Sequence, residues 1–145
     1  MSKPLKLLLF PCLLSLAILL RSSTADVGTA AYYGPPYLPT VCYGRDPGQF
    51  PGSGLFAAAG EGIWDNGASC GRQYFLRCLS SATPNACIKD RIIQVKVVDR
   101  GTMLNSLPSR NGTTMVLSNA AFQMIASQAA QVINIEFRQV LETKS

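Results

Sequence analysis

Alternating apolar and polar residues mark the clearest strands of this chain. Residues 73–78 place Tyr74, Leu76 and Cys78 on one face and Gln73, Phe75 and Arg77 on the other. Residues 92–98 and 131–140 alternate in the same way. A period of two is typical of a strand that buries one face. We therefore expect three such strands in the second half of the chain.

Shorter apolar runs predict three further strands. They lie at residues 28–33, 55–59 and 113–117, and turn-forming residues flank them. Ser118 then fits the N-cap position of a short helix at residues 119–126, with Phe122 and Ile125 turned inward. About six short strands, one brief helix and long loops predict an all-β fold in the form of a small closed barrel.

Turn signals separate these elements. Asp65-Asn66-Gly67 predicts a tight turn, because asparagine tolerates a positive φ and glycine has no Cβ to clash there. Residues 34–54 contain five prolines and five glycines and predict a long surface loop. Such a loop is more often functional or disordered than merely connecting. Residues 79–89 predict a hairpin loop closed by Cys87, and residues 102–112 predict another polar loop.

The first 25 residues have the pattern of a secretory signal peptide. Lys3 and Lys6 precede an almost wholly apolar run at residues 7–20, and small residues at 23–25 offer a cleavage site. A membrane anchor is the alternative, but the run is short for a bilayer, which requires about 20 residues. We expect cleavage after Ala25, a single extracellular domain at residues 26–145, and no membrane span thereafter.

Removal of this leader changes the charge of the chain. Lys3, Lys6 and Arg21 account for three of 13 basic residues, so ten remain against eight acidic ones and the net charge falls from +5 to +2. Nucleic-acid binding thereby loses its main compositional support. The remaining 120 residues are enough for one domain and too few for two. We expect a monomer.

The cysteines predict crosslinks rather than a metal site. Cys12 lies in the leader, which leaves Cys42, Cys70, Cys78 and Cys87. Four cysteines in an exported chain are typical of two disulfides, with three possible pairings. The spacings contain no paired C-x-x-C motifs and the chain has no histidine, which disfavours zinc. No cofactor is expected.

A possible modification site lies in the second polar loop. Asn111-Gly112-Thr113 matches the acceptor motif for N-glycosylation, which an exported chain can use. Asn-Gly is also an ordinary turn signal. Both interpretations of Asn111 stay open.

The absence of histidine limits the possible chemistry. It removes the usual general base near neutral pH and the usual partner of a catalytic triad. A pair of carboxylates acting on a glycosidic bond remains possible. Asp99 is the best candidate, because it ends an inner strand, although it could simply cap the turn or pair with Arg100. Asp46 could supply a second carboxylate or form a plain Asp-Pro-Gly turn, and Asp65 belongs to the Asn-Gly turn.

Aromatic residues could provide stacking surfaces for sugar rings. They are concentrated before the central turn, at Tyr32, Tyr33, Tyr37, Tyr43 and Trp64. Aromatic side chains beside strands pack into cores at least as often as they bind ligands. Tyr33, Trp64 and Asp99 are the predicted groove residues.

Five segments resemble a known family when they are taken in order. They are Gly28-Thr-Ala-Ala-Tyr-Tyr33, Cys42-Tyr-Gly44, Trp64-Asp-Asn-Gly-Ala-Ser-Cys-Gly71, Val95-Lys-Val-Val-Asp-Arg100 and Leu117-Ser-Asn-Ala-Ala-Phe-Gln-Met-Ile-Ala126. The chain resembles the plant expansin-like proteins with a family-45-endoglucanase-like domain, a group that includes plant natriuretic peptides and blight-associated proteins. The resemblance implies a six-stranded double-psi β-barrel, secretion to the apoplast, and disulfides Cys42–Cys70 and Cys78–Cys87. It also implies that the carbohydrate-binding second domain of true expansins is lacking.

The chain departs from the family pattern at three positions. Ala31 stands where the pattern has threonine, Val116 where it has the essential aspartate, and Gly101 where relatives with six cysteines have one. Asp99 is then the only groove acid left, and one carboxylate cannot hydrolyse a glycoside by the usual two-carboxylate route. Hydrolase activity is therefore the least favoured hypothesis.

The resemblance therefore implies a non-enzymatic secreted protein. It would act in water and ion homeostasis or stress signalling, through a cell-surface receptor and residues 33–64. The alternative is a cell-wall module that holds a polysaccharide near Tyr33 and Asp99 without cutting it.

The leader generates a direct prediction. Mass analysis of the protein secreted by a plant host should give Asp26 as the first residue, because signal peptidase cuts after small residues that follow an apolar run. A secreted product that begins with Met1 would contradict the assignment.

Overall fold

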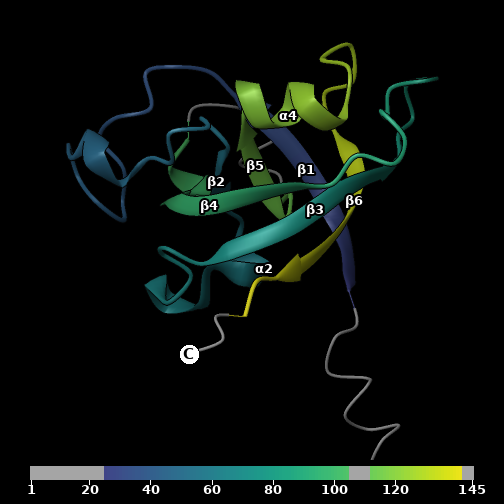
Figure 1. Cartoon of the computed structure of the whole chain (residues 1–145). Helices are drawn as coiled ribbons and strands as arrows, with labels where there is room; N and C mark the ends of the chain where they lie inside the picture. Colours follow the sequence, from purple (N-terminus) through teal and green to yellow (C-terminus); the bar gives the residue numbers. More distant parts are fainter. Residues whose placement is uncertain (1–24, 105–111, 142–145) are drawn as a thin grey trace, which may run out of the picture.

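The computed structural model of the chain describes residues 25–104 and 112–141. These described residues form six strands and two short α-helices, joined by loops that include three single turns of 3₁₀-helix (Figure 1). The strands are β1 (Asp26–Tyr33), β2 (Phe56–Ala59), β3 (Gln73–Ser80), β4 (Ile93–Arg100), β5 (Met115–Ser118) and β6 (Ile133–Gln139). The helices are α2 (Glu61–Trp64) and α4 (Asn119–Ile125), and the 3₁₀ turns are η1 (Pro47–Gln49), η2 (Asp65–Gly67) and η3 (Gly101–Met103).

The strands close into a barrel in the order β1-β5-β2-β4-β3-β6. β1 runs parallel to β5 and β2 runs parallel to β4, whereas the other four neighbouring pairs are antiparallel. Figure 1 shows α4 across one end of the barrel and α2 near the opposite end. The expected closed six-stranded barrel is confirmed.

The inner face of the barrel holds the main core. The predicted alternation is confirmed in β3, where Tyr74, Leu76 and Cys78 are buried, and β4 and β6 bury alternate residues in the same way until the end of β4. Phe122 and Ile125 of α4 are fully buried against this core, as expected. Each fully buried side chain of this size stabilises the fold by about 1.5–3 kcal/mol.

β2 and β5 are buried on both faces. Every residue of Phe56–Ala59 and of Met115–Ser118 is buried. A second apolar cluster explains this, since it covers the outer face of the barrel and lies beneath residues 34–54. We call residues 34–54 the strap. The buried members of this outer cluster are Ala31, Tyr33, Phe56, Ala58, Val98 and Val116, and Tyr37, Tyr43, Phe50 and Leu104 pack against them.

The strap is fastened to the barrel at several points. The Cys42–Cys70 disulfide ties it to the segment before β3. The Lys96 ammonium donates to the Gln49 carbonyl at 2.9 Å, and the Ser118 hydroxyl donates to the Gly54 carbonyl at 2.8 Å. The strap is therefore a surface segment, exposed at residues 34–36, 39, 41, 44–48 and 52–53, whose aromatic side chains pack onto the barrel. The predicted surface loop pinned by its cysteine is confirmed, and its aromatic residues Tyr37, Tyr43 and Phe50 are partly buried against the outer cluster.

The central turn has the predicted backbone. Asp65, Asn66 and Gly67 all have positive φ, at 54°, 52° and 92°. Arg72 holds the Asp65 carboxylate at 2.8 Å, which confirms that Asp65 serves the turn. The short helix α2 before the turn was not predicted. Helix α2 begins after Gly60. A Cβ at Gly60 would overlap the Thr113 carbonyl oxygen, so the close approach of the chain at Gly60 to Thr113 requires glycine.

The N-cap of α4 and the disulfide pairing agree with expectation. The Ser118 hydroxyl accepts a hydrogen bond from the Ala121 amide at 3.2 Å, and the helix ends at Ile125. The disulfides join Cys42 to Cys70 and Cys78 to Cys87. Most of the predicted leader and the Asn111 acceptor site lie outside the described residues. None of the described helices has the length and apolar run that a bilayer crossing demands.

The disulfides give a stability prediction. Replacing Cys42 and Cys70 together by serine should lower the free energy of unfolding by about 3.5 kcal/mol, and replacing Cys78 and Cys87 by about 2.5 kcal/mol. The order follows from the sequence separations, which are 28 and 9 residues, because the longer loop has more entropy to lose. Urea unfolding of the two double variants checks it, and the reverse order would refute the loop-entropy account.

Candidate functional site

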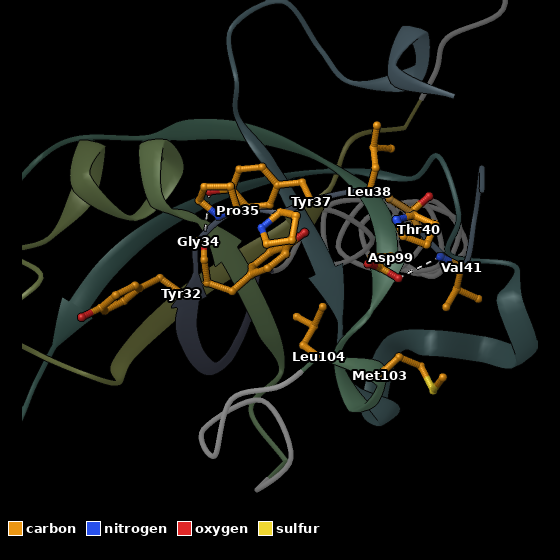
Figure 2. Close-up of a pocket in the computed structure, with 13 residues that line it drawn as sticks. Tyr32, Gly34, Pro35, Tyr37, Leu38, Thr40, Val41, Asp99, Met103 and Leu104 are labelled. Carbon is orange, nitrogen blue, oxygen red and sulfur yellow. Dashed lines mark hydrogen bonds between the residues drawn. The ribbon is translucent and has the colours of Figure 1, made fainter. Parts of the chain in front are cut away.

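A groove of roughly 750 Å³ opens where the start of the strap meets the end of β4. Its size falls within the usual range for ligand sites. The strap, together with the end of β1, forms one wall, and η3 with the residue after it forms the other (Figure 2). The lining residues are Tyr32, Tyr33, Gly34, Pro35, Pro36, Tyr37, Leu38, Pro39, Thr40, Val41, Asp99, Met103 and Leu104.

Asp99 is the acid of this groove. Its side chain is recessed, and the residue is only 4% exposed. Oδ1 accepts hydrogen bonds from the backbone amides of Val41 at 2.9 Å and Arg100 at 2.8 Å, the first of which is drawn in Figure 2. Burial raises the pKa of the Asp99 carboxyl above its usual range, although the two amide bonds oppose the shift. Asp99 therefore holds the strap against β4 while it faces the groove.

The Arg100 guanidinium does not pair with Asp99. It binds the Glu61 carboxylate through two hydrogen bonds of 2.8 and 3.0 Å, and it lies over the Trp64 ring at 5.4 Å. The alternative that Asp99 forms an ion pair with Arg100 is therefore wrong. The alternative that Asp99 caps the turn is right in part, since its Oδ1 accepts the Arg100 amide.

Tyr33 lies beside Asp99 in the groove wall. Its ring meets Tyr37 edge to face at 5.0 Å, and the residue is 8% exposed. Its hydroxyl is buried without a hydrogen-bond partner among the described residues. Burial raises the pKa of Tyr33, and the negative charge of Asp99 raises it further. Tyr33 and Asp99 therefore line the same groove.

The other groove tyrosines have their hydroxyls engaged. The Tyr32 hydroxyl donates to the Gln128 carbonyl at 2.9 Å, and the Tyr37 hydroxyl donates to the Tyr33 carbonyl at 3.1 Å. Tyr32 also packs its ring against Phe122 at 4.5 Å. The rings of Tyr32 and Tyr37 shape the groove, and both hydroxyls donate to backbone carbonyls of the fold.

Trp64 does not belong to the groove. It is 8% exposed, sits in the main core and is covered by Arg100. The expectation that Trp64 lines the groove is corrected, because α2 carries its side chain inward at the end of the barrel. Tyr43 also lies outside the groove lining, under Lys96 at 5.1 Å.

No second carboxylate faces Asp99 among the described residues that line the groove. Val116 and Ala31, two of the three expected departures from the family pattern, are both fully buried in the outer cluster with Tyr33. Asp46 instead caps η1 and accepts from the Gly48 amide at 2.9 Å. Within residues 25–104 and 112–141, no group of three or more potential metal ligands comes together. The lining that the structure describes thus offers one carboxylate, that of Asp99, and no carboxylate pair.

The sequence analysis missed most of the apolar groove wall. Leu38 and Pro39 come from the strap, whereas Met103 and Leu104 follow β4, some 60 positions later. The five prolines of the strap were the only available signal, since they indicated a segment unable to pair in the sheet. Nothing in the local pattern indicates which distant segment the prolines face.

Comparisons with known proteins place this barrel in a class. A family model described as lytic transglycolase, DPBB_1, matches residues 57–137. Two solved structures of a Clavibacter michiganensis expansin, a mutant in complex with cellohexaose and an apo form, share the fold with TM-scores of 0.61 and 0.58 at 16% identity. Each alignment covers 84% of this chain and 53% of the expansin, so the chain spans about half the length of that protein. The fold is the expected double-psi β-barrel of expansin-like proteins.

Curated relatives narrow the class. An EG45-like domain containing protein of Citrus jambhiri is 37% identical over 131 residues, which cover 86% of this chain and 91% of the relative. EG45-like domain containing protein 2 of Arabidopsis thaliana is 36% identical, over 83% of this chain and 85% of the relative. Putative EG45-like domain containing protein 1 of the same plant is 34% identical, over 84% of this chain and 89% of the relative. The chain belongs to the family of EG45-like domain containing proteins.

The unpartnered Tyr33 hydroxyl gives a prediction. Tyr33→Phe should raise the free energy of unfolding by about 1 kcal/mol, because it removes a buried polar group that has no hydrogen bond. Tyr32→Phe is the matched control and should lower it by about 1 kcal/mol, since it removes a hydroxyl that donates to Gln128. Urea unfolding measures both, and equal losses in the two variants would show that the Tyr33 hydroxyl has a partner.

Proposed function

We propose that this chain is a secreted, non-enzymatic protein of the apoplast that acts by binding, in water and ion homeostasis or stress signalling, as plant natriuretic peptides do. The observation that carries the proposal is the groove with one carboxylate. The proposal includes removal of residues 1–25, a monomeric single domain at residues 26–145, a cell-surface receptor and a glycan at Asn111.

The chemistry of glycoside hydrolysis supports the non-enzymatic part. Hydrolases of the usual kind hold two carboxyl groups about 5–5.5 Å or about 6.5–9.5 Å apart, one on each side of the bond that is cut. Here the second position is Val116, which is fully buried in apolar surroundings. An acid placed there would be desolvated without a partner, so the site favours packing over catalysis.

The strap supports a signalling role. Residues 44–48 are exposed, while the disulfide at Cys42 and the hydrogen bond from Lys96 to Gln49 hold the flanks of this stretch in place. Arg45 is exposed and has no hydrogen bond or ion pair among the described residues. A rigid, exposed stretch with an uncommitted arginine suits recognition by a protein partner, since arginine is enriched in binding hot spots.

A second candidate function is the binding of a cell-wall polysaccharide in the groove, near Tyr33 and Asp99. The specific observation in its favour is the groove itself, on a barrel whose fold matches an expansin that was solved with cellohexaose. A module of this kind would hold a glucan chain without cutting it.

The proposal predicts a biological response without sugar release. Purified, disulfide-intact protein should change the volume and ion flux of plant protoplasts and release no reducing sugar from cellohexaose or xyloglucan. Arg45→Ala should raise the protein concentration required for half the protoplast response by about tenfold, the effect of losing a contact of roughly 1.4 kcal/mol. Arg138→Ala, an exposed arginine of β6, is the matched control and should respond as the unaltered protein does.

Three results would count against these assignments. Protoplasts that do not respond would contradict the signalling role. Soluble sugar from either polysaccharide would contradict the non-enzymatic assignment. Retention on insoluble cellulose by a protein that leaves protoplasts unchanged would favour the second candidate.

A further inference from the structure

Asp99 is a buried acid that forms no ion pair with a lysine or arginine in the described part of the chain. No arginine or lysine among the described residues pairs with it, and the nearest guanidinium along the chain, that of Arg100, is committed to Glu61. Buried carboxylates in proteins are ordinarily paired with a positive group or a metal, because leaving the charge desolvated is costly. The groove therefore presents an anionic group whose charge the described part of the chain leaves unpaired.

The two oxygens of this carboxylate differ. Oδ1 already accepts two backbone amides, from Val41 and Arg100. Oδ2 accepts no hydrogen bond from a described residue, and it is not among the unpartnered atoms sealed from solvent. One recessed oxygen is therefore available from the groove. It can accept a single donor but cannot complete the two-oxygen fork that a guanidinium binds best.

The walls around this oxygen are largely apolar. Leu38, Pro39 and Leu104 line the groove, and at its rim Val41 and Met103 remain 48% and 65% exposed. Exposed methionine and aliphatic side chains around a recess are typical of surfaces that receive apolar segments of a partner. A long, thin side chain with an apolar stem and a charged tip matches this shape, whereas the broad ring of a sugar brings neutral hydroxyls that each need a polar partner.

We propose that this groove receives a lysine side chain of an extracellular protein partner, with its ammonium on Asp99 Oδ2 and the neighbouring apolar residues of the partner against Val41, Met103 and Leu104. The inference rests on the proposed function, because it supplies the contact by which a non-enzymatic protein would engage a partner. Lysine is selected over arginine because only one carboxylate oxygen is free. An unbranched aliphatic stem is required because the oxygen is recessed behind apolar walls.

Peptide titration tests this assignment. The isotope-labelled protein is titrated with the blocked peptide acetyl-Gly-Leu-Lys-Leu-Gly-amide, and binding is followed by the NMR shifts of the Val41 and Arg100 amides, which report directly on Asp99. Replacing the lysine by norleucine, which keeps the stem and removes the ammonium, should weaken binding by about tenfold or more. Replacing the lysine by arginine should weaken binding by about threefold or more. A guanidinium binds best to two carboxylate oxygens, and Asp99 offers only one.

Two protein variants locate the contact. Asp99→Asn keeps an oxygen for the Val41 and Arg100 amides but turns an amide toward the ligand. This variant should bind the lysine peptide about tenfold or more weakly than the unaltered protein does. Glu136→Gln removes the same charge from β6, where the carboxylate binds Arg77 outside the groove, and should leave binding unchanged. Amide spectra of both variants confirm that the barrel is intact.

The outcomes separate the alternatives. Shifts that depend on the ammonium and on Asp99 would support the inference. Equal binding of the norleucine peptide, or no binding of the lysine peptide, would overturn it, and equal binding of the arginine peptide would overturn the single-oxygen assignment. Cellohexaose that shifts the same amides while the lysine peptide does not would assign the groove to a glucan instead. The protoplast response uses none of these peptides, so failure of this inference and failure of the proposed function are distinguishable.

Discussion

The burial of the barrel's outer face beneath the strap is the interaction on which the rest of this structure depends. β2 and β5 are apolar on both sides, so a barrel without the strap would expose Phe56, Ala58 and Val116 to water. The Cys42–Cys70 disulfide and the Asp99 hydrogen bond to Val41 hold the covering segment in place. The groove exists only because the strap's first residues meet the end of β4.

The same packing determines which side chains border the groove. The side chains of Ala31 and Val116 both belong to the apolar cluster under the strap. Apolar packing at these points stabilises the outer layer, and a polar side chain there would be desolvated. The groove beside this cluster is lined by one recessed carboxylate, that of Asp99, among largely apolar side chains.

The candidate site was only partly predictable. Asp99 was found because it ends an apolar strand, and Tyr33 because an aromatic residue closes the first strand. Trp64 was assigned to the groove from its neighbourhood in sequence, but α2 turns it into the core. An ion pair with Arg100 was one alternative for Asp99, because the two residues are adjacent in sequence, but the Arg100 guanidinium binds the Glu61 carboxylate at 2.8 Å.

By itself, the amino-acid sequence determined the local features: the alternating strands, the Asp65-Asn66-Gly67 turn, the Ser118 cap and the supply of cysteines for two crosslinks. These follow from side-chain period and backbone preference within a few residues, which a linear pattern records. Only the tertiary structure decided which strands are parallel, that the aromatic residues of the strap pack onto the outer face of the barrel, and that Leu38 faces Met103 and Leu104 across a groove. Those relations join segments dozens of residues apart, and they depend on how apolar surfaces fit together after the barrel has closed.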